Sequence, residues 1–201
     1  MTTEQTAAAH AGEARHVLWD GEDPAVHRLR AVLAPFLPNG TVRVVLQQLR
    51  LHEHGRLDAI HELIDVIVDV EGNLVVMALG ETVRGDAAAA ARLDVELAAV
   101  RATLDAHGLV GRDSLEIVLD ADGSEQVLLA FGLELAAHDL HERPEALHGG
   151  EHHVAQHSAE LDDLRDRLDA QQRRRTPWWR RLRRAISDRI PHSPRILRRS
   201  P

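Results

Sequence analysis

Apolar and polar residues follow two different periods along the first two thirds of the chain, and each period predicts an element. Between Asp23 and Phe36 the apolar residues recur every three to four positions, which places them on one face of a helix. Asp23-Pro24 supplies a capping side chain and a proline at the first helical position. Asn39-Gly40 supplies a turn beyond the helix. The pattern therefore predicts a helix that begins at Asp23-Pro24 and gives way to a turn.

Three strand patterns follow this turn. Residues 42–53 alternate apolar with other side chains, although their apolar residues also recur at the helical spacing i, i+3, i+4 and i+7. The β-branched residues that open the segment favour a strand over a helix. A second, long strand is predicted for residues 60–70, and a third for residues 74–79 after the turn at residues 71–73.

A second helix and a hairpin complete the pattern. Asp86 caps a helix predicted for residues 87–106, and a glycine-containing segment closes it. Residues 114–119 and 126–131 are two apolar runs separated by an Asp-Gly turn, which is typical of a hairpin. The order of elements predicts an α+β domain, with an antiparallel sheet of about five strands and helices on one face.

The rest of the chain differs in composition from this domain. Residues 158–172 form an acidic helix whose apolar residues have 3-4 spacing, but the pattern is too short for a convincing coiled coil. We expect this apolar side to pack on the domain. The expected segments are a flexible N-terminus (1–22), the α+β domain (23–135), a His-rich linker (136–157), the short acidic helix (158–172) and an Arg-rich amphipathic tail (173–201).

Composition excludes several kinds of chemistry. All 24 basic residues are Arg, and Cys is absent, so the chain offers no phosphate-binding or Schiff-base lysine, no thiol nucleophile and no disulfide. The N-terminus lacks the basic and apolar regions of a signal peptide. No apolar run approaches the ~18 residues that span a bilayer. We expect a cytoplasmic protein that needs no cofactor.

Charge is divided unevenly along the chain. Residues 173–201 carry 11 of the 24 Arg and one acid, Asp188. Residues 1–172 carry the other 13 Arg against 31 acids. A basic tail on an acidic body is expected to bind a polyanionic surface or to dock on the body itself.

The tail also has an amphipathic pattern. Trp179, Leu182, Ile186 and Ile190 recur every three to four residues after Pro177, a stripe that suits an anionic membrane surface at the inner face of the membrane. Nucleic acid is the main alternative, because Arg binds phosphate and Trp stacks on bases. The predicted contact residues are Arg173, Arg174, Arg175, Trp178, Trp179, Arg180, Arg181, Arg183 and Arg184.

Acidic residues provide a second candidate surface. Asp65 and Asp69 are predicted on one face of the second strand, and Glu62 near its start. These three carboxylates form a candidate site for a basic protein partner, against the simpler interpretation of a solvated strand face. Asp120 and Asp122 resemble the start of a calcium loop, but the later ligand positions do not match, so a hairpin turn is expected there.

Histidines cluster before the acidic helix. His148 and His152, and likewise His153 and His157, are four residues apart, a spacing that lets each pair share a helix face and bind Zn²⁺ or Ni²⁺. Gly149-Gly150 interrupts the segment, so a hydrophilic linker is the alternative interpretation. A metal-binding protein therefore stays open as a hypothesis.

Residues 24–134 contain a series of short motifs: Leu37-Pro38-Asn39-Gly40, Val42-Arg-Val-Val-Leu46, Val100-Arg101-Ala-Thr-Leu104, Leu115-Glu-Ile-Val-Leu119, Asp122-Gly123 and Val127-Leu-Leu-Ala-Phe131. In these motifs the chain resembles the YezG-like immunity proteins, small acidic proteins that neutralise bacterial toxins. The resemblance implies an α+β fold and a non-enzymatic protein whose acidic face, with Glu62, Asp65 and Asp69, binds a basic partner such as a toxin. A nucleic-acid-binding adaptor and a His-rich metal-binding protein are the alternatives.

Overall fold

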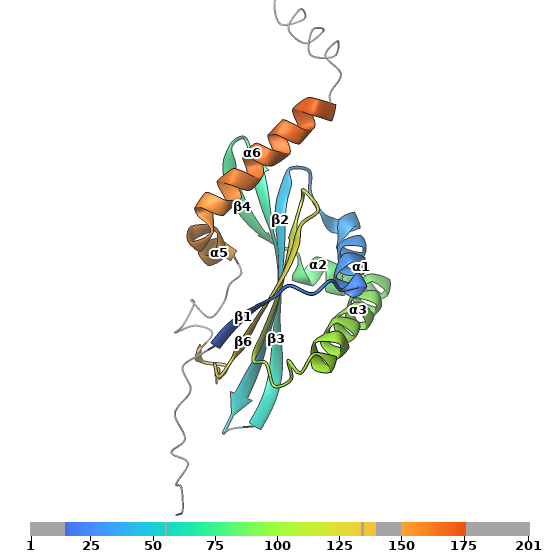
Figure 1. Cartoon of the computed structure of the whole chain (residues 1–201), viewed down its shortest axis with the longest axis vertical. Coiled ribbons are helices and arrows are strands. Elements are labelled where there is room, and N and C mark those ends of the chain that lie inside the picture. The colour runs from blue at the N-terminus through green and yellow to red at the C-terminus, as the bar shows by residue number, and fades with distance from the viewer. Residues whose placement is uncertain (1–14, 55, 134, 140–149, 176–201) are drawn as a thin grey trace, which may run out of the picture.

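A computed structural model describes residues 15–54, 56–133, 135–139 and 150–175, and its centre is one antiparallel sheet (Figure 1). The strands lie in the order β1-β6-β5-β2-β3-β4. Their bounds are β1 Arg15–Trp19, β2 Thr41–Glu53, β3 Arg56–Val70, β4 Asn73–Ala78, β5 Ser114–Asp120 and β6 Glu125–Phe131. The α+β prediction is confirmed, and residues 42–53 form a strand and not the alternative helix.

The first face of the sheet is covered by helices from within the domain. They are α1 (Pro24–Leu33), continued by the 3-10 turn η1 (Ala34–Phe36), α2 (Gly80–Gly85) and α3 (Ala87–Ala106). The predicted caps are present, because the Asp23 carboxylate accepts from Ala25 N at 2.7 Å and that of Asp86 accepts from Ala88 N and Ala89 N at 3.0 Å. Local sequence signals therefore set where both long helices begin.

The core between these helices and the sheet is aliphatic. Leu29 of α1 and Leu97 of α3 are fully buried against Leu46 of β2 and Ile117 of β5. The residues of β2, β3, β5 and β6 that join this core are alternate residues, as the period of two predicts. This face thus follows directly from the apolar pattern of the sequence.

The second face of the sheet is covered by the C-terminal helices α5 (Gly150–Gln156) and α6 (Ser158–Arg175), which lie opposite α1 and α3 in Figure 1. Leu161 and Leu164 of α6 are buried against Val42, Val45 and Ile67. The expectation that the acidic helix packs on the domain is confirmed. The helices of the domain itself lie on one face, as expected, and the helical extension covers the second face, whose strands also carry apolar residues.

Two further elements were not predicted. The first is β1, which lies inside the segment expected to be flexible and pairs with β6 from Arg15↔Phe131 to Trp19↔Val127. Its five residues are too few to show a period, yet Trp19 packs edge-on against His107 with ring centroids 6.0 Å apart. The second is the short helix α2. Residues 1–14 lie outside the described part of the chain, so flexibility stays a prediction for them.

The expected linker also needs correction. Residues 150–157 are part of the folded structure, because α5 occupies Gly150–Gln156 and leads directly into α6. His153 of α5 is buried. These residues are ordered by contacts with strands that lie far away in the sequence. The His-rich composition does not predict such contacts.

Candidate functional site

A buried arginine holds the two C-terminal helices against the sheet. Strand β2 places Arg43 on the second face, with 1% of its surface exposed, directly beside Asp120 of β5 in the strand register. Arg43 Nε donates to Asp120 Oδ1 at 2.6 Å, and Nη2 donates to Asp120 Oδ2 at 3.1 Å. The bidentate geometry fixes the plane of the guanidinium.

Both C-terminal helices reach this guanidinium. Arg43 Nη2 also donates to Glu160 Oε1 of α6 at 2.5 Å. Nη1 lies 3.3 Å from His153 Nε2 of α5. Because a guanidinium only donates, the His153 Nε2 atom accepts this hydrogen bond. The cluster formed by Arg43, Asp120, Glu160 and His153, called the Arg43 cluster below, therefore joins β2, β5, α5 and α6.

The charged groups of the Arg43 cluster stabilise one another. Burial alone would lower the pKa of Arg43, but its hydrogen bonds and charge interactions with Asp120 and Glu160 outweigh burial and raise that pKa. Burial would likewise raise the pKa of Glu160, and the interactions with Arg43 and then His157 lower it instead. Arg43 and Glu160 are therefore both ionised near neutral pH, and each stabilises the other.

The predicted histidine site is only partly brought together. The rings of His153 and His157 stack with centroids 4.3 Å apart, and His157 Nδ1 lies 3.1 Å from Glu160 Oε2. His148 lies outside the described residues, and the side chain of His152 is not described either. Within the described part of the chain no three His, Asp or Glu residues are grouped to hold a metal ion. The Arg43 guanidinium also disfavours a cation beside His153.

The three acidic residues predicted on the second strand do not form one surface. Glu62 lies on the first face, where Arg84 of α2 donates to its carboxylate at 2.8 and 2.7 Å. Asp65 lies on the second face and is only 8% exposed. Asp69 accepts from Arg165 Nε of α6 at 2.8 Å. The three carboxylates therefore lie on two faces of the sheet, and each is paired with an arginine or buried.

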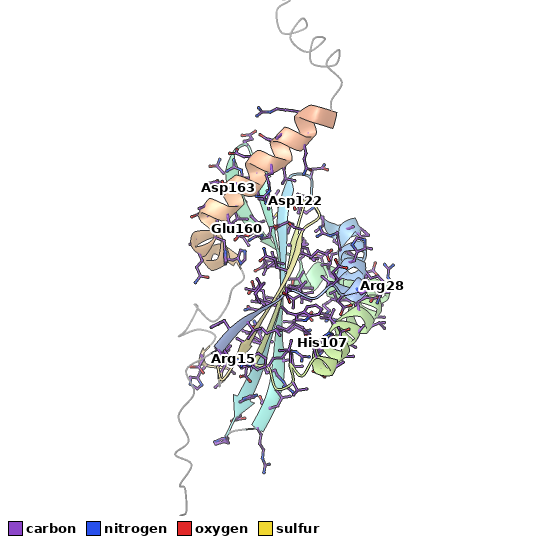
Figure 2. All side chains as sticks on the ribbon, viewed as in Figure 1. Arg15, Arg28, His107, Asp122, Glu160 and Asp163 are labelled. Carbon is purple, nitrogen blue, oxygen red and sulfur yellow. The ribbon has the colours of Figure 1, made fainter. Side chains whose placement is uncertain are left out.

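Exposed carboxylates gather instead on the outer side of α6. Asp162, Asp163, Asp166 and Asp169 are all exposed along this helix. Arg165 of the same helix donates to Asp69. Arg167 donates to Asp122 of the β5–β6 turn at 3.2 Å. Figure 2 shows Asp122 beside α6, with Glu160 and Asp163 on the helix itself. Arg165 also donates to Asp162 Oδ1 at 3.1 Å, so among the described residues Asp163 and Asp166 are the acids of this outer side without an ion pair.

The calcium-like motif is a hairpin turn, as expected. Asp120 pairs with Arg43, and the Asp122 carboxylate accepts from Ser124 N at 3.0 Å and from Ser124 Oγ at 2.6 Å. Burial alone would raise the pKa of Asp122, but Ser124 and Arg167 lower it. Both carboxylates therefore stabilise the turn and its contact with α6.

Sequence reasoning missed the Arg43 cluster. One signal was present, because Arg43 stands at an alternating position inside an apolar strand, where an unpaired charge would be strongly destabilising. The partners Asp120 and Glu160 are 77 and 117 residues away, so the sequence did not identify them.

The predicted tail site falls mostly outside the described residues. Arg173 is exposed and lies 3.6 Å from Asp169. The side chains of Arg174 and Arg175 are not described, and Trp178, Trp179, Arg180, Arg181, Arg183 and Arg184 lie beyond the described part. None of the helices in the described ranges has the length and apolar character needed to cross a membrane.

Comparison of the chain with protein-family models, with curated proteins and with solved structures finds no match. The geometry of the described residues is therefore the basis for the functional argument.

Proposed function

We propose that this chain is a non-enzymatic binding protein that captures a basic protein partner on the outer side of α6 and is held at an anionic membrane surface by its Arg-rich tail. One observation carries the proposal. The β3 carboxylates are paired or buried, whereas all four aspartates on the outer side of α6 are exposed: Asp163 and Asp166 form no ion pair among the described residues, and Asp162 and Asp169 pair only with Arg165 and Arg173 of the same helix. An exposed row of like charges raises the rate and the specificity of association with a partner of opposite charge.

The attachment of α6 supports this role. Leu161 and Leu164 are buried beneath the helix, and the Arg43 cluster fixes its N-terminal part. A partner would therefore meet a row of carboxylates that is already ordered, which reduces the entropy lost on binding. The YezG-like resemblance supports an acidic role, and the exposed aspartates of α6 support this helix as its position.

The direction of α6 supports the proposal that the Arg-rich tail binds an anionic membrane surface. Figure 1 shows the C-terminal end of α6 reaching beyond the sheet. Residues 169–173 are exposed, so this end of the helix is not buried against the domain. The Arg-rich segment that follows Arg175 therefore starts away from the sheet, where a surface can be reached without unfolding the domain.

The partner-binding half is tested with a polyarginine peptide as the probe and the full chain as the protein. We expect Asp162→Asn, Asp163→Asn and Asp166→Asn together to weaken binding about tenfold, because three exposed charges each contribute a few tenths of a kcal/mol or more. A matched control replaces three exposed acids elsewhere, Glu22→Gln, Asp58→Asn and Glu81→Gln. Equal weakening by both triple variants, measured by calorimetry, would contradict a site on α6.

The tail is tested by flotation with vesicles of anionic and of neutral lipid. We expect the full chain to float with the anionic vesicles and a chain ending at residue 172 to remain in solution. Binding that survives added RNA supports the membrane surface, and binding that RNA removes supports the nucleic-acid alternative. No flotation by the full chain would contradict a tail that binds membranes.

A further inference from the structure

A cavity of about 240 Å³ lies on the first face of the sheet, between the C-terminal end of α3 and strands β2, β3 and β5. Figure 2 marks this end of α3 by His107. Three arginines line the cavity, Arg50 from β2, Arg101 from α3 and Arg112 from the loop before β5. The cavity thus gathers three guanidinium groups in a chain whose net charge is −8.

Arg112 is part of the framework of this cavity. It is 8% exposed, and its Nη1 donates to Asp105 Oδ1 at 2.6 Å and to the Leu109 carbonyl at 2.8 Å. These bonds close the C-terminal end of α3 and position the loop that forms one wall. The charge of Arg112 is balanced by Asp105.

The charges of Arg50 and Arg101 are not balanced by a carboxylate among the described residues. Arg50 Nη1 donates to the Arg112 carbonyl at 3.5 Å, and Arg101 Nε donates to the Leu97 carbonyl at 3.2 Å. Among the described residues neither arginine forms an ion pair with a carboxylate. Both are half-buried in the cavity wall, where a charge without a partner is poorly solvated.

The other carboxylate of the cavity is directed elsewhere. Asp113 lines the cavity, but its Oδ2 accepts from Gly132 N at 2.6 Å and from Leu133 N at 3.1 Å. These backbone bonds hold Asp113 toward the end of β6. Asp113 therefore does not form an ion pair with Arg50 or Arg101.

The remaining wall is apolar. Ile60, Val110 and Leu115 line the same cavity, and Ile60 and Val110 are exposed although they are aliphatic. A ligand with an uncharged aliphatic part can cover these side chains and remove them from water. A doubly charged inorganic phosphate would meet the same apolar wall and would lose its hydration without that gain.

We infer that this cavity binds a small organic carboxylate with a short aliphatic chain. The carboxylate accepts from the terminal nitrogens of Arg50 and Arg101, whose forked geometry suits two carboxylate oxygens. The aliphatic chain lies against Ile60, Val110 and Leu115. This site is separate from the acidic side of α6, and neither proposal depends on the other.

The test uses the full chain and hexanoate as the probe, with binding measured by saturation-transfer NMR. We expect saturable binding with a Kd of about 1 mM, the range for a carboxylate held by two half-exposed arginines with a small apolar area. Acetate should bind at least about tenfold more weakly, because it lacks the methylene groups that cover the apolar wall. Hexanol, which keeps the chain and lacks the charge, should also bind at least about tenfold more weakly.

Variants separate this site from general attraction of anions to the Arg-rich tail. Arg101→Gln and Arg50→Gln should each weaken hexanoate binding about tenfold or more. Arg92→Gln, an exposed position on the same helix as Arg101, should leave it unchanged. A thermal unfolding curve like that of the unmodified chain shows that each variant is folded. Hexanoate binding that survives Arg101→Gln and Arg50→Gln, equal binding of hexanol, preference for inorganic phosphate, or no saturable binding at all would each overturn the inference.

Discussion

The two faces of the sheet are built from different interactions. The first face packs aliphatic side chains of α1 and α3 on alternate strand residues such as Leu46 and Ile117. The second face combines a smaller apolar cluster around Leu161 and Leu164 with the buried Arg43–Asp120 pair. Apolar contacts have no preferred direction, whereas a bidentate ion pair does. The first face thus supplies most of the buried apolar area, and the second face determines where α5 and α6 attach.

The largest expected effect comes from breaking the buried pair on the second face. Asp120→Ala leaves the Arg43 guanidinium buried with only the half-exposed Glu160 as a charged partner. Removing one member of a buried ion pair typically costs about 3–5 kcal/mol, and urea unfolding measures this loss. Asp58→Ala, at an exposed position, is the control and should change stability by less than about 0.5 kcal/mol. A loss below about 1 kcal/mol for Asp120→Ala would contradict the importance of the pair.

A substitution in the core of the first face should lower the free energy of unfolding slightly less than Asp120→Ala does. Its cause is a cavity and not an unpaired charge. Leu97 is fully buried in the aliphatic core, and Leu97→Ala should lower the free energy of unfolding by about 3 kcal/mol through the cavity it leaves. Because this core joins all the central strands, every structural probe should report the same loss. Urea unfolding followed by circular dichroism and by Trp fluorescence checks this, and two separate transitions would speak against one cooperative core.

Replacing both members of the pair sharpens the comparison. Arg43→Met with Asp120→Leu removes the buried charges together, and such replacements are often neutral or stabilising. We expect the double variant to be at least about 2 kcal/mol more stable than Asp120→Ala, by the same urea unfolding. A double variant as unstable as Asp120→Ala would show that the ion pair itself, and not the unpaired charge, accounts for the loss.

The smallest effect is a pH dependence confined to the second face. The pKa of Glu160 is lowered in the folded protein, since Arg43 outweighs the opposing effect of burial. The stability that Glu160 contributes is therefore complete above the ordinary glutamate pKa of 4.5 and is lost as the pH falls through the lower folded value. Amide exchange of α6 should accelerate on acidification, and Glu160→Gln should reduce that dependence. An unchanged pH dependence in Glu160→Gln would exclude Glu160 as its source.

The sequence predicted the first face far better than the second. Asp23 and Asp86 act through neighbouring residues, so both helix starts were visible from local sequence. The contact of Leu161 and Leu164 with the domain followed from their spacing. The Arg43 cluster joins side chains more than 70 residues apart, and local pattern carries no information on such pairs. For the same reason the β3 carboxylates were assigned to a binding surface, although distant arginines pair with Glu62 and Asp69.

The most direct test of the central claim is amide hydrogen exchange of α6 at neutral pH, in the full chain and in Asp120→Ala. The account predicts protected amides over residues 161–168 in the unmodified chain, because Leu161 and Leu164 are buried and Glu160 is bound to Arg43. In Asp120→Ala the protection of α6 should fall more than that of α3. Rapid exchange of α6 in the unmodified chain, or equal loss in both helices of the variant, would contradict an α6 that the Arg43 cluster holds on the second face.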